Sequence, residues 1–343
     1  MKVLVVNNAA PFIRGGAEAL ADALVAQLNA TPGVESELLR IPFRWEPSER
    51  LIDEILIHRR LKLWNVDRVI ALKFPAYLTP HPSKVLWLLH QFRQAYDLGD
   101  AGQGLGRDGR DGEIRRAIRT ADNLCFSQAR ALFVNSPVTR DRLKRYNGFD
   151  GEVLYPPVND EHLFVGGKDE GYIFAGGRVA PGKRQHLLIE AMAQVKTGRL
   201  VIAGPSESDE YRKGLEGRID ALNLGDRVEL HLGFHDRERV AAWVNGARAC
   251  AYLPYDEDSL GYVTMEAFAS GKPVLTATDC GGLLEMVDAN TGYVAEPDPA
   301  SLASGLAMLF DYPRRAAELG RAARAEWRRR GVNWPATIER LLS

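Results

Sequence analysis

The chain has 343 residues, of which 45% are hydrophobic and 26% charged, and its formal net charge is −1. This length predicts two domains of ~150 residues, each able to bury a normal core. The balanced charge, with a pI of about 6.7, argues against a nucleic-acid-binding protein, which needs a strongly basic surface.

No segment of the sequence predicts secretion or a membrane span. The opening MKVLVV is too short for the apolar region of a signal peptide, and no run approaches the ~20 apolar residues that a spanning helix needs. Cys125, Cys250 and Cys280 lack CxxC spacing and sit in apolar or Gly-rich contexts, so we expect buried, reduced thiols. These features predict a cytoplasmic protein.

The first half of the chain alternates short apolar runs with amphipathic segments. Strands are expected at residues 3–6, 68–72, 85–89, 131–135 and 153–155. A helix is expected over residues 17–28, where apolar residues recur at helical spacing. Alternating strands and helices predict a parallel sheet with crossover helices.

A segment rich in Pro and Gly, residues 155–171, interrupts this rhythm and is interpreted as a linker. A second alternation follows, with strands expected at 172–175, 200–203, 228–232, 250–253 and 273–276, and helices over 185–193, 236–245 and 260–270, the second of them capped by Asp236. The prediction is an α/β protein with domains at 1–158 and 159–330, two Rossmann-like sheets facing a cleft. In such sheets, ligands bind at the carboxyl ends of the strands.

One segment of the first half, residues 98–112, is dominated by Gly, Asp and Arg. This composition predicts a mobile loop, which is either a lid or acceptor-side loop or a disordered insertion. Its G-x-G-x-G does not directly follow a strand, which argues against a dinucleotide fingerprint.

Two glycines, Gly15 and Gly16, stand between the first strand and the first helix. A helix N-terminus offers free N–H groups and a positive dipole end, so this turn suits an anionic ligand. The spacing is not G-x-G-x-x-G, which disfavours a nicotinamide cofactor. A glycine turn that serves packing alone is the alternative.

Cations and glycines recur where the later strands end. Arg178 and Lys183 follow the first strand of the second half, and two cations there, just ahead of a helix, suit a diphosphate. Solvated surface charges are the alternative. Later strands run into Gly204 and Gly233, and His235 then either contacts a base or is an ordinary loop histidine.

The stretch YDEDSLGYVTMEAFASGKPVL carries Asp258 and Glu266 on either side of Gly261. Asp258 or Ser259 can cap the helix that follows. Glu266 lies among apolar residues of a helix that looks buried, and a buried carboxylate needs a hydrogen-bond partner, which ribose or sugar hydroxyls would supply. Gly261 would let phosphate oxygens reach backbone N–H groups.

Together these pieces resemble the family 4 (GT4) retaining glycosyltransferases of the GT-B fold, and the resemblance covers nearly the whole chain. The matching pieces are residues 15–18, Gly177-Arg178 with Lys183, HLGF, the 258–271 stretch and DCGGLLEMV from Asp279. The resemblance implies an acceptor domain followed by a nucleotide-sugar donor domain, with a C-terminal helix at 331–343 that packs back onto the first.

The resemblance also implies roles for single residues. Arg178 and Lys183 match the pair that binds the donor diphosphate. Glu266 matches the second glutamate of an E-x7-E motif, which contacts the ribose, and Asp258 falls where the first glutamate holds the transferred sugar. His90 falls where many members place a histidine near that sugar, with an ordinary loop histidine as the alternative. The other donor-binding candidates are Gly15, Gly16, Gly204, Gly233, His235, Gly261, Tyr262 and Val263.

Two departures from the family pattern bear on these roles. The first carboxylate is Asp258 rather than Glu, which shortens its reach by ~1.5 Å, and Ser259-Leu260 replaces the more usual Gly-Phe after it. Arg184 follows Lys183 where a glycine is usual, which would add a cation near the diphosphate or on the acceptor side.

The implied activity is metal-independent, retaining transfer of a sugar from a nucleoside-diphosphate sugar, UDP- or GDP-linked, to a glycan, lipid-linked or small-molecule acceptor. Pre-placed cations would stabilise the charge that grows on the leaving diphosphate. No cofactor is expected beyond this donor substrate, and no nucleic acid. Asp258 and Glu266 then position the donor and are not a hydrolase pair.

Alternatives remain open at this point. A GT-B relative that hydrolyses or epimerises the donor would share the fold, as would a catalytically silent subunit that binds sugar nucleotides. A nicotinamide oxidoreductase is disfavoured because no dinucleotide fingerprint is present. The basic segment 113–133 is expected to be an amphipathic helix, whose outer face is either an ordinary solvated one or a peripheral contact with the inner face of a membrane.

Overall fold

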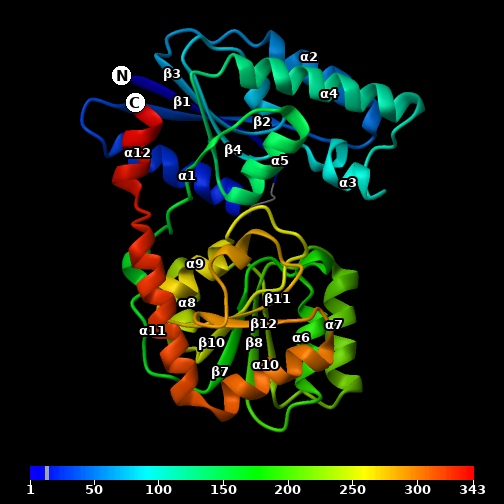
Figure 1. Cartoon of the computed structure of the whole chain (residues 1–343), viewed down its shortest axis with the longest axis vertical. Helices are drawn as coiled ribbons and strands as arrows, with labels where there is room; N and C mark the ends of the chain where they lie inside the picture. Colours follow the sequence, from blue (N-terminus) through cyan, green and yellow to red (C-terminus); the bar gives the residue numbers. More distant parts are fainter. Residues whose placement is uncertain (12–14) are drawn as a thin grey trace. The chain divides into compact units, whose positions relative to one another are not determined.

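The computed structural model describes residues 1–11 and 15–343, and it divides into two compact units (Figure 1). Unit 1 is Met1–Pro157 together with Val332–Ser343, and unit 2 is Val158–Gly331. Each unit contains a six-stranded sheet whose strands pair in parallel. Because parallel strands need crossover connections, helices cover the two faces of each sheet.

The sheet of unit 1 has the strand order β2-β1-β3-β4-β5-β6. Its strands are β1 (Lys2–Ala9), β2 (Glu35–Pro42), β3 (Arg68–Lys73), β4 (Lys84–His90), β5 (Ala131–Val134) and β6 (Glu152–Val153). Its α-helices are α1 (Gly16–Asn29), α2 (Leu51–Arg60), α3 (Asp97–Asp100), α4 (Gly109–Ser127), α5 (Pro137–Asn147) and α12 (Trp334–Leu342). Short 3-10 turns lie at Ser48–Arg50, Ala76–Leu78 and Arg93–Ala95.

The core of unit 1 has two layers, one on each side of the sheet. Successive strand residues point to opposite faces, so Val5 packs in the layer of α1 and α12 while Val6 packs in the layer of α2 and α4. The last helix, α12, contributes Trp334, Ile338 and Leu341 to the first of these layers. The C-terminal helix therefore belongs to unit 1.

The segment 98–112, expected to be a mobile loop, is helical at both ends, and part of its backbone packs against unit 1. It begins inside α3 and ends inside α4, and Leu105 N–H donates to the carbonyl of Gln94 over 2.9 Å. A Cβ added at Gly104 would come within 2.5 Å of the same carbonyl oxygen. Gly99, Gly104 and Gly112 lie against neighbouring backbone, while Gly102 and Gly109 have a positive φ, and composition alone does not distinguish these uses from disorder.

The helix expected over 113–133 corresponds to α4, which is amphipathic as predicted but ends at Ser127, and residues 131–133 belong to β5. Its apolar face, with Ile114 and Ile118, is buried in the core of unit 1. Arg116, Thr120 and Asn123 are exposed on the outer side. The outer side of α4 is therefore largely a polar, solvated face, which is the ordinary alternative.

The sheet of unit 2 has the strand order β12-β11-β10-β7-β8-β9. Its strands are β7 (Tyr172–Gly176), β8 (Arg199–Gly204), β9 (Val228–Leu232), β10 (Ala249–Ala251), β11 (Val274–Ala277) and β12 (Gly292–Ala295). Its α-helices are α6 (Gln185–Met192), α7 (Asp209–Ala221), α8 (Arg237–Gly246), α9 (Tyr262–Ala269), α10 (Pro299–Asp311) and α11 (Pro313–Arg330). Short 3-10 turns lie at Glu161–Leu163, Pro181–Lys183 and Gly282–Glu285.

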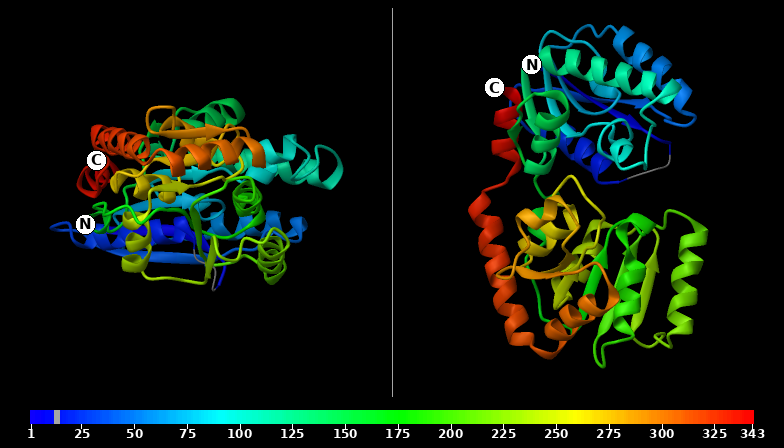
Figure 2. Two further views of the ribbon diagram at one scale, coloured as in Figure 1. Left: turned by 90° about the horizontal axis from the view of Figure 1, so that it is seen from below. Right: turned by 45° about the vertical axis from the view of Figure 1, so that its right-hand side comes forward.

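The helices of unit 2 sort onto the two faces of its sheet (Figure 2). Helix α6 packs against α7 and α10 on one face, and α9 packs against α8 and α11 on the other. Right-handed crossovers produce this division, because the chain moves one way along the sheet from β7 to β9 and the opposite way from β10 to β12. The carboxyl ends of the strands and the loops that follow them therefore gather at one edge.

The sequence predicted the central strands of both sheets but not β2 or β12. Both missing strands lie at sheet edges, and β2 alternates exposed and partly buried residues instead of forming an apolar run. Asp236 caps α8 as predicted, with its carboxylate accepting from Arg239 N–H over 2.7 Å. The three cysteines are buried and free, as predicted. Within residues 1–11 and 15–343, every helix falls short of the length and apolarity needed to cross a bilayer.

Candidate functional site

The loops after β7, β8 and β9 are joined by backbone hydrogen bonds at the carboxyl edge of the second sheet. Val179 N–H donates to the carbonyl of Pro205 over 2.9 Å, and Gly233 N–H donates to that of Gly204 over 3.0 Å. At Gly204, φ is +144° and an added Cβ would lie 1.9 Å from the Gly177 carbonyl oxygen. A glycine is therefore required at position 204 for the first two loops to meet.

The loop after β10 joins this group through Tyr255 N–H, which donates to the carbonyl of Gly182 over 2.9 Å. Gly261, at the end of that loop, has a φ of +73°, and a Cβ there would lie 2.5 Å from the Tyr252 ring. Close packing against Tyr252 thus explains Gly261, while its approach to a phosphate stays a prediction.

Lys183 is the anchored member of the predicted cation pair. Its ammonium donates to the Tyr252 hydroxyl over 3.0 Å, forms an ion pair with Glu257, and lies 5.2 Å from the centroid of the Tyr252 ring. Burial raises the pKa of Tyr252 well above its usual value, and Glu257 raises it further. The hydroxyl therefore stays protonated, so the charged partners here are the ammonium and one carboxylate.

Arg178 is the solvent-facing member of the pair. Its side chain is 52% exposed, and the nearest carboxylate, Glu207, lies 3.9 Å from its Nε atom. Its positive charge opposes the rise in the pKa of Tyr252, so it acts on the same group that Lys183 contacts. The two cations thus share one electrostatic environment, and Arg178 keeps donors available.

Arg184 does not add a cation for a ligand, so that expectation is wrong. Its guanidinium binds both carboxylate oxygens of Asp279 at 2.7 Å and donates to the carbonyls of Leu253 and Pro254. Its backbone is left-handed, with a φ of +53°. Arg184 joins the loops after β7, β10 and β11, and its charge is neutralised within the chain.

The segment around Asp258, the first of the two predicted carboxylates, differs from the sequence interpretation in two ways. Helix α9 begins at Tyr262 with Gly261 as N-cap and no side-chain cap, so neither Asp258 nor Ser259 caps it. The left-handed turn at Gly261 starts the helix in their place. Glu257, one residue before Asp258, is the acid that contacts Lys183, and the sequence analysis did not single it out.

Glu266 is buried, as predicted, with 5% of its surface exposed. Arg237 supplies a hydrogen-bond partner within the chain, donating to the Glu266 Oε1 atom over 2.7 Å. Burial raises the pKa of Glu266, and Arg237 opposes that rise. A carboxylate accepts several hydrogen bonds, so this pair leaves capacity for a ribose hydroxyl.

Arg237 is a candidate that the sequence analysis missed. Besides Glu266, it donates to the carbonyl of Asn159 over 2.8 Å, and its guanidinium lies 4.9 Å from the centroid of the Phe164 ring. Residue 237 opens α8, at the carboxyl edge of the sheet. The position of Arg237 at the start of a helix that follows a strand could have marked it as a site residue. Its partner Glu266 lies 29 residues further along the chain, so the pairing could not be predicted from spacing.

His235 and the first residues of α9 lie at the same edge. His235 Nε2 lies 2.9 Å from the carbonyl oxygen of His231, and its ring meets that of Trp243 edge to face at 4.8 Å. These contacts support the ordinary loop-histidine alternative for one ring nitrogen. Burial raises the pKa of Tyr262, and Val263 is 8% exposed.

The remaining candidates belong to unit 1. Gly15 precedes α1, and its N–H donates over 2.9 Å to Glu18, which also forms an ion pair with Lys73. Gly16 is the first residue of α1, and His90 is the last residue of β4, with Nδ1 lying 2.7 Å from the carbonyl oxygen of Gln91.

The structure thus divides the predicted residues between the units. It brings together, at one edge of the second sheet, Arg178, Lys183, Gly204, Gly233, His235, Asp258, Gly261, Tyr262, Val263 and Glu266. Gly15, Gly16 and His90 lie at the carboxyl ends of strands in unit 1. Among the described residues, no three His, Cys, Asp or Glu side chains form a group that could hold a metal ion.

Residues 159–326, nearly all of unit 2, match the family model described as glycosyl transferases group 1. Unit 2 is a group 1 glycosyltransferase domain. The resemblance to glycosyltransferases drawn from the motifs of the second half is thereby confirmed for unit 2. In this group 1 domain, the cation pair lies in the loop after β7 and Glu266 lies in α9.

The chain is also similar to proteins that are named glycosyltransferases. The chain is 33% identical over 162 residues to the D-inositol 3-phosphate glycosyltransferase of Streptomyces avermitilis, covering 44% of this chain and 34% of that protein. It is 26% identical over 251 residues to human alpha-1,3/1,6-mannosyltransferase ALG2, covering 63% and 59%. The chain thus spans about a third to three fifths of the length of these relatives.

The fold as a whole is GT-B. The sucrose-phosphate synthase of Thermosynechococcus elongatus superposes with a TM-score of 0.76 at 20% identity, covering 99% of this chain and 97% of that one. HepE of Anabaena, solved in complex with UDP-glucose, gives a TM-score of 0.73 at 19% identity, with coverage of 100% and 98%. Both units, and not only the group 1 domain, therefore follow the GT-B arrangement of strands and helices.

Proposed function

We propose that this protein is a retaining glycosyltransferase that uses a nucleoside-diphosphate sugar as donor. The observation that carries the proposal is the cationic edge of the group 1 domain, where Arg178 faces solvent and Lys183 is held beside it by Tyr252 and Glu257. A departing diphosphate gains negative charge in the transition state, and fixed cations stabilise that charge most where it grows.

The pairing of Lys183 with Glu257 indicates how the site would accept a donor. A diphosphate would compete with Glu257 for the ammonium, while Tyr252 keeps the lysine in place. Arg178, with its exposed planar guanidinium, would bind phosphate oxygens in a bidentate manner. These two cations would supply the neutralisation that metal-dependent transferases obtain from an ion, so we propose a metal-independent reaction.

The carboxylates would position the donor. Glu266, fixed by Arg237 in a buried setting, would accept a hydrogen bond from a ribose hydroxyl. Asp258, 6% exposed, would accept one from the transferred sugar, with a shorter reach than the glutamate common at this place. With these groups as positioning residues, attack would come from the acceptor hydroxyl on the face that the diphosphate leaves, which retains the anomeric configuration.

We also propose a class of donor and a class of acceptor, guided by the relatives. HepE was solved with UDP and with UDP-glucose, so we propose a UDP-linked donor, with a GDP-linked one as the alternative. The acceptor would be a glycan, a lipid-linked glycan or a small molecule.

A thermal-shift screen against UDP, GDP, ADP and their sugars tests the donor proposal, since a ligand that binds the folded state raises its melting temperature. We expect one nucleoside diphosphate to give a clear shift, which Arg178→Ala and Lys183→Ala abolish. Lys213→Ala, an exposed lysine on α7 that forms no ion pair among the described residues, is the matched control. An unchanged shift in both site variants would contradict the cation pair.

A catalytically silent subunit is the second candidate, and Asp258 in place of glutamate favours it. Such a protein would bind the nucleotide without turning over its sugar. Measuring release of nucleoside diphosphate from the selected donor, with and without added acceptors, separates the two. Binding without release under any acceptor would favour the silent subunit.

For peripheral membrane contact, we propose a surface on α2 and the residues that follow it. Leu56 and Ile57 are 52% and 54% exposed, and Trp64 is 84% exposed. Arg60 lies on the same side of α2 by its i+3 and i+4 spacing, and Lys62 is also exposed. Apolar, aromatic and cationic side chains together are typical of a surface that binds anionic lipid.

Sedimentation with vesicles of phosphatidylcholine and phosphatidylglycerol tests this surface. The chain should co-sediment, and a variant with serine at positions 56, 57 and 64 should stay in solution. Tyr312→Ser, which removes an exposed aromatic of unit 2, is the control and should still co-sediment. Equal sedimentation of both variants would contradict the proposed surface.

A further inference from the structure

The Gly-, Asp- and Arg-rich segment 98–112 lines a pocket in unit 1, and the proposed function does not use this pocket. The pocket has a volume of about 450 Å³, within the ~300–1,000 Å³ range of small-molecule sites. It is formed by the segment itself, α4 and the end of α5, and its lining residues are Asp100, Arg107, Gly112, Arg115, Arg116, Arg119, Arg145 and Tyr146.

Arg115 and the glycines give this pocket a fixed wall. The buried guanidinium of Arg115 donates to the carbonyls of Ala95 and Leu105 and to Asp100 over 2.8 Å. A Cβ added at Gly112 would lie 2.2 Å from the carbonyl oxygen of Arg107. The backbone on both sides of the pocket is therefore closely packed.

The charge of the pocket is strongly unbalanced. Among its described lining residues, five are arginines and Asp100 is the one carboxylate. Asp100 lies 2.8 Å from Arg115 and 3.5 Å from Arg107. The pKa of Asp100 is lowered first by its hydrogen bond with Arg115 and then by the charges of Arg115, Arg107 and Arg119, so it remains ionised and still leaves a large positive surplus.

Aromatic rings order the remaining guanidinium groups. Arg119 lies 5.2 Å from the centroid of the Tyr96 ring and 5.7 Å from that of Tyr146, and Arg145 lies 5.1 Å from the Tyr146 ring. The Nε atom of Arg119 is buried and has no hydrogen-bond acceptor among the described residues. Stacking on a ring fixes the plane of a guanidinium and leaves its N–H groups directed outward for a ligand.

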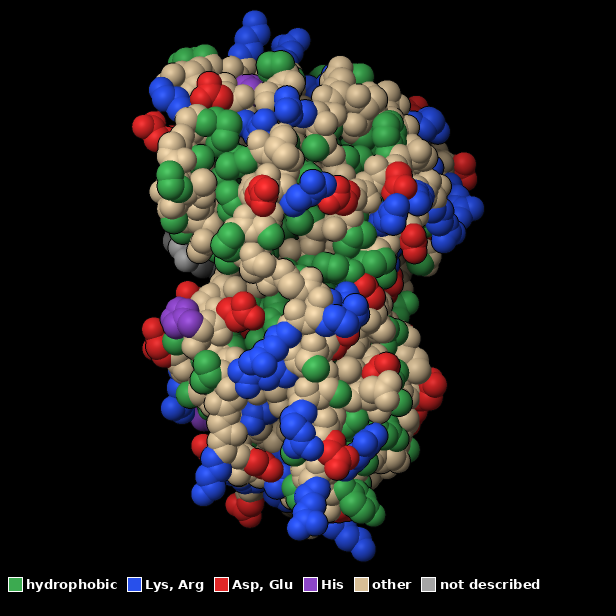
Figure 3. All heavy atoms as spheres, turned by 60° about the vertical axis from the view of Figure 1, so that its left-hand side comes forward, with side chains coloured by type: hydrophobic (Ala, Val, Ile, Leu, Met, Phe, Trp, Pro, Cys, Tyr) green, Lys and Arg blue, Asp and Glu red, His purple; other side chains and the backbone are tan. Residues whose placement is uncertain are grey.

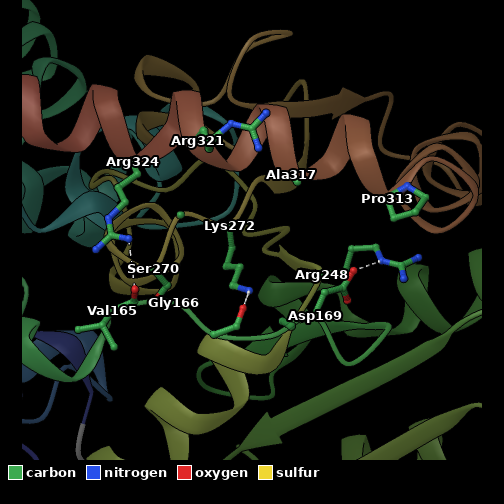
Figure 4. A pocket seen from close by; sticks show the side chains of 13 residues that line it. Val165, Gly166, Asp169, Arg248, Ser270, Lys272, Pro313, Ala317, Arg321 and Arg324 are labelled. Atoms are coloured by element: carbon green, nitrogen blue, oxygen red, sulfur yellow. Dashed lines mark hydrogen bonds and ion pairs between the residues drawn. The ribbon is translucent and has the colours of Figure 1, made fainter.

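A second pocket lined by basic residues lies in unit 2, and several of its arginine and lysine side chains have structural partners within the chain. It lies against α11 and has a volume of about 370 Å³ (Figure 4); basic side chains gather over this face of unit 2 in Figure 3. Arg248 pairs with Asp169, Lys272 donates to the carbonyl of Gly167, and Arg324 donates to that of Val165. These cations attach the segment 165–169 to the rest of the unit.

We propose that the arginine pocket of unit 1 binds a ligand through a phosphate group. The planar fork of arginine matches phosphate oxygens in a bidentate manner, and here five arginines line one cavity whose described lining residues include a single carboxylate, Asp100. The ligand is a phosphate monoester or diphosphate, carried either by a soluble molecule or by a lipid headgroup. The inference stands on these contacts and does not require that the chain transfers sugars.

Titration with inorganic pyrophosphate, followed by calorimetry on the full chain, tests the proposal. The Arg178→Ala/Lys183→Ala variant is the host, because it removes the diphosphate contacts proposed in unit 2. We expect one binding site in this host, and about tenfold or greater weakening when Arg119→Gln and Arg145→Gln are added, since each removes charge-assisted hydrogen bonds. Arg116→Gln, on the exposed side, should weaken binding by a smaller factor.

Arg110→Gln is the matched control, because Arg110 lies on the same helix, is exposed, and does not line the pocket. It should leave the affinity unchanged. No binding in the host at low salt, or equal loss in the control and the pocket variants, would overturn the proposal. If the host does not fold, the unmodified chain should show two sites, of which the pocket substitutions remove one. Loss of both sites or of neither would overturn it equally.

Vesicles distinguish the two sources of phosphate. If phosphatidylcholine vesicles containing phosphatidic acid bind the chain, and the Arg119→Gln/Arg145→Gln pair or free pyrophosphate abolishes that binding, the ligand is a lipid headgroup. If pyrophosphate binds the pocket and these vesicles do not compete, the ligand is a soluble phosphorylated molecule. Both outcomes support the phosphate site, and failure of both probes refutes it.

Discussion

Two cationic regions of this molecule differ in how many carboxylate partners their positive side chains have. At the carboxyl edge of unit 2, three cations have carboxylate partners: Lys183 with Glu257, Arg184 with Asp279, and Arg237 with Glu266. In the pocket of unit 1, five arginines and one carboxylate, Asp100, are among the lining residues, and Asp100 contacts Arg115 and Arg107.

The difference bears on selectivity. An anion that enters the edge of unit 2 must displace or adjust a carboxylate, so binding favours a ligand whose other parts contribute further contacts. An anion that enters the arginine pocket meets more positive than negative charge, because five arginines and one carboxylate are among the described lining residues. The first arrangement suits discrimination among donors, and the second suits capture of a phosphate group.

The largest expected effect is on turnover at the paired site. Lys183→Ala should lower kcat for sugar transfer ~10²–10³-fold, because a fixed cation near the leaving group is lost while Glu257 stays. Steady-state kinetics with the selected donor measures this loss, with Lys213→Ala as control. A change confined to KM would mean that Lys183 binds ground state and transition state equally.

Removing Arg237 tests the buried pair. Arg237→Ala should lower the free energy of unfolding by about 2–3 kcal/mol, because Glu266 is left buried without its cation. Chemical denaturation measures the loss. Glu266→Gln added to Arg237→Ala should recover part of it, and a double variant no more stable than the single one would contradict the pairing.

The same variant has a predictable pH dependence. Burial raises the pKa of Glu266 in the folded chain, so folding favours the protonated form, and the contribution of this group to stability falls as pH rises through its folded pKa. Without Arg237 the folded pKa rises further. The Arg237→Ala defect should therefore grow from about pH 5 to about pH 8, and a defect that shrinks over this interval would contradict the assignment.

Glu257→Gln should make the unit 2 edge behave more like the arginine pocket. Lys183 would lose its internal counter-charge, so the selected nucleoside diphosphate should bind ~3–5-fold more tightly. Calorimetry measures the affinity, and Glu207→Gln, near the exposed Arg178, is the control for a general change in charge. Weaker binding would mean that Glu257 itself contacts the ligand.

Salt provides the smallest and most direct comparison. Raising the ionic strength from about 50 to about 200 mM should weaken pyrophosphate binding at the arginine pocket two- to threefold. Nucleoside diphosphate binding in unit 2 should change less, because of its two cations Lys183 is already paired with Glu257 and only Arg178 faces solvent. Titrations of the two sites in the same buffers measure the contrast, which disappears if both regions use charge alike.

How well each strand could be predicted from the sequence depends on how deeply the strand is buried. Central strands such as β4 are buried on both faces and form continuous apolar runs, which the sequence reveals directly. Edge strands such as β2 are half exposed and have no such pattern. Both α8 and α9 were expected as helices, but the capping residue was predicted correctly only where a side chain makes the cap, as at Asp236, and not where a glycine turn does, as at Gly261.

The site residues show a similar limit. The burial of Glu266 could be predicted from its apolar neighbours, but its partner Arg237 comes from another helix. Which acid of the Asp-Glu-Asp run meets Lys183 depends on the backbone, because Asp256 has a φ of +47° and Glu257 pairs with Gly281 in a short bridge. The arginine pocket joins residues from three segments, and spacing along one segment does not reveal such convergence.

The placement of α12 affects how the protein is made. Trp334, Ile338 and Leu341 complete a core layer whose strand residues, from Val3 to Phe133, are synthesised much earlier. During translation, the amino-terminal unit must wait, with Leu24 and its neighbours uncovered, until the ribosome has released nearly all of the intervening group 1 domain. A chaperone that shields this apolar layer would therefore engage the nascent chain early and leave it late.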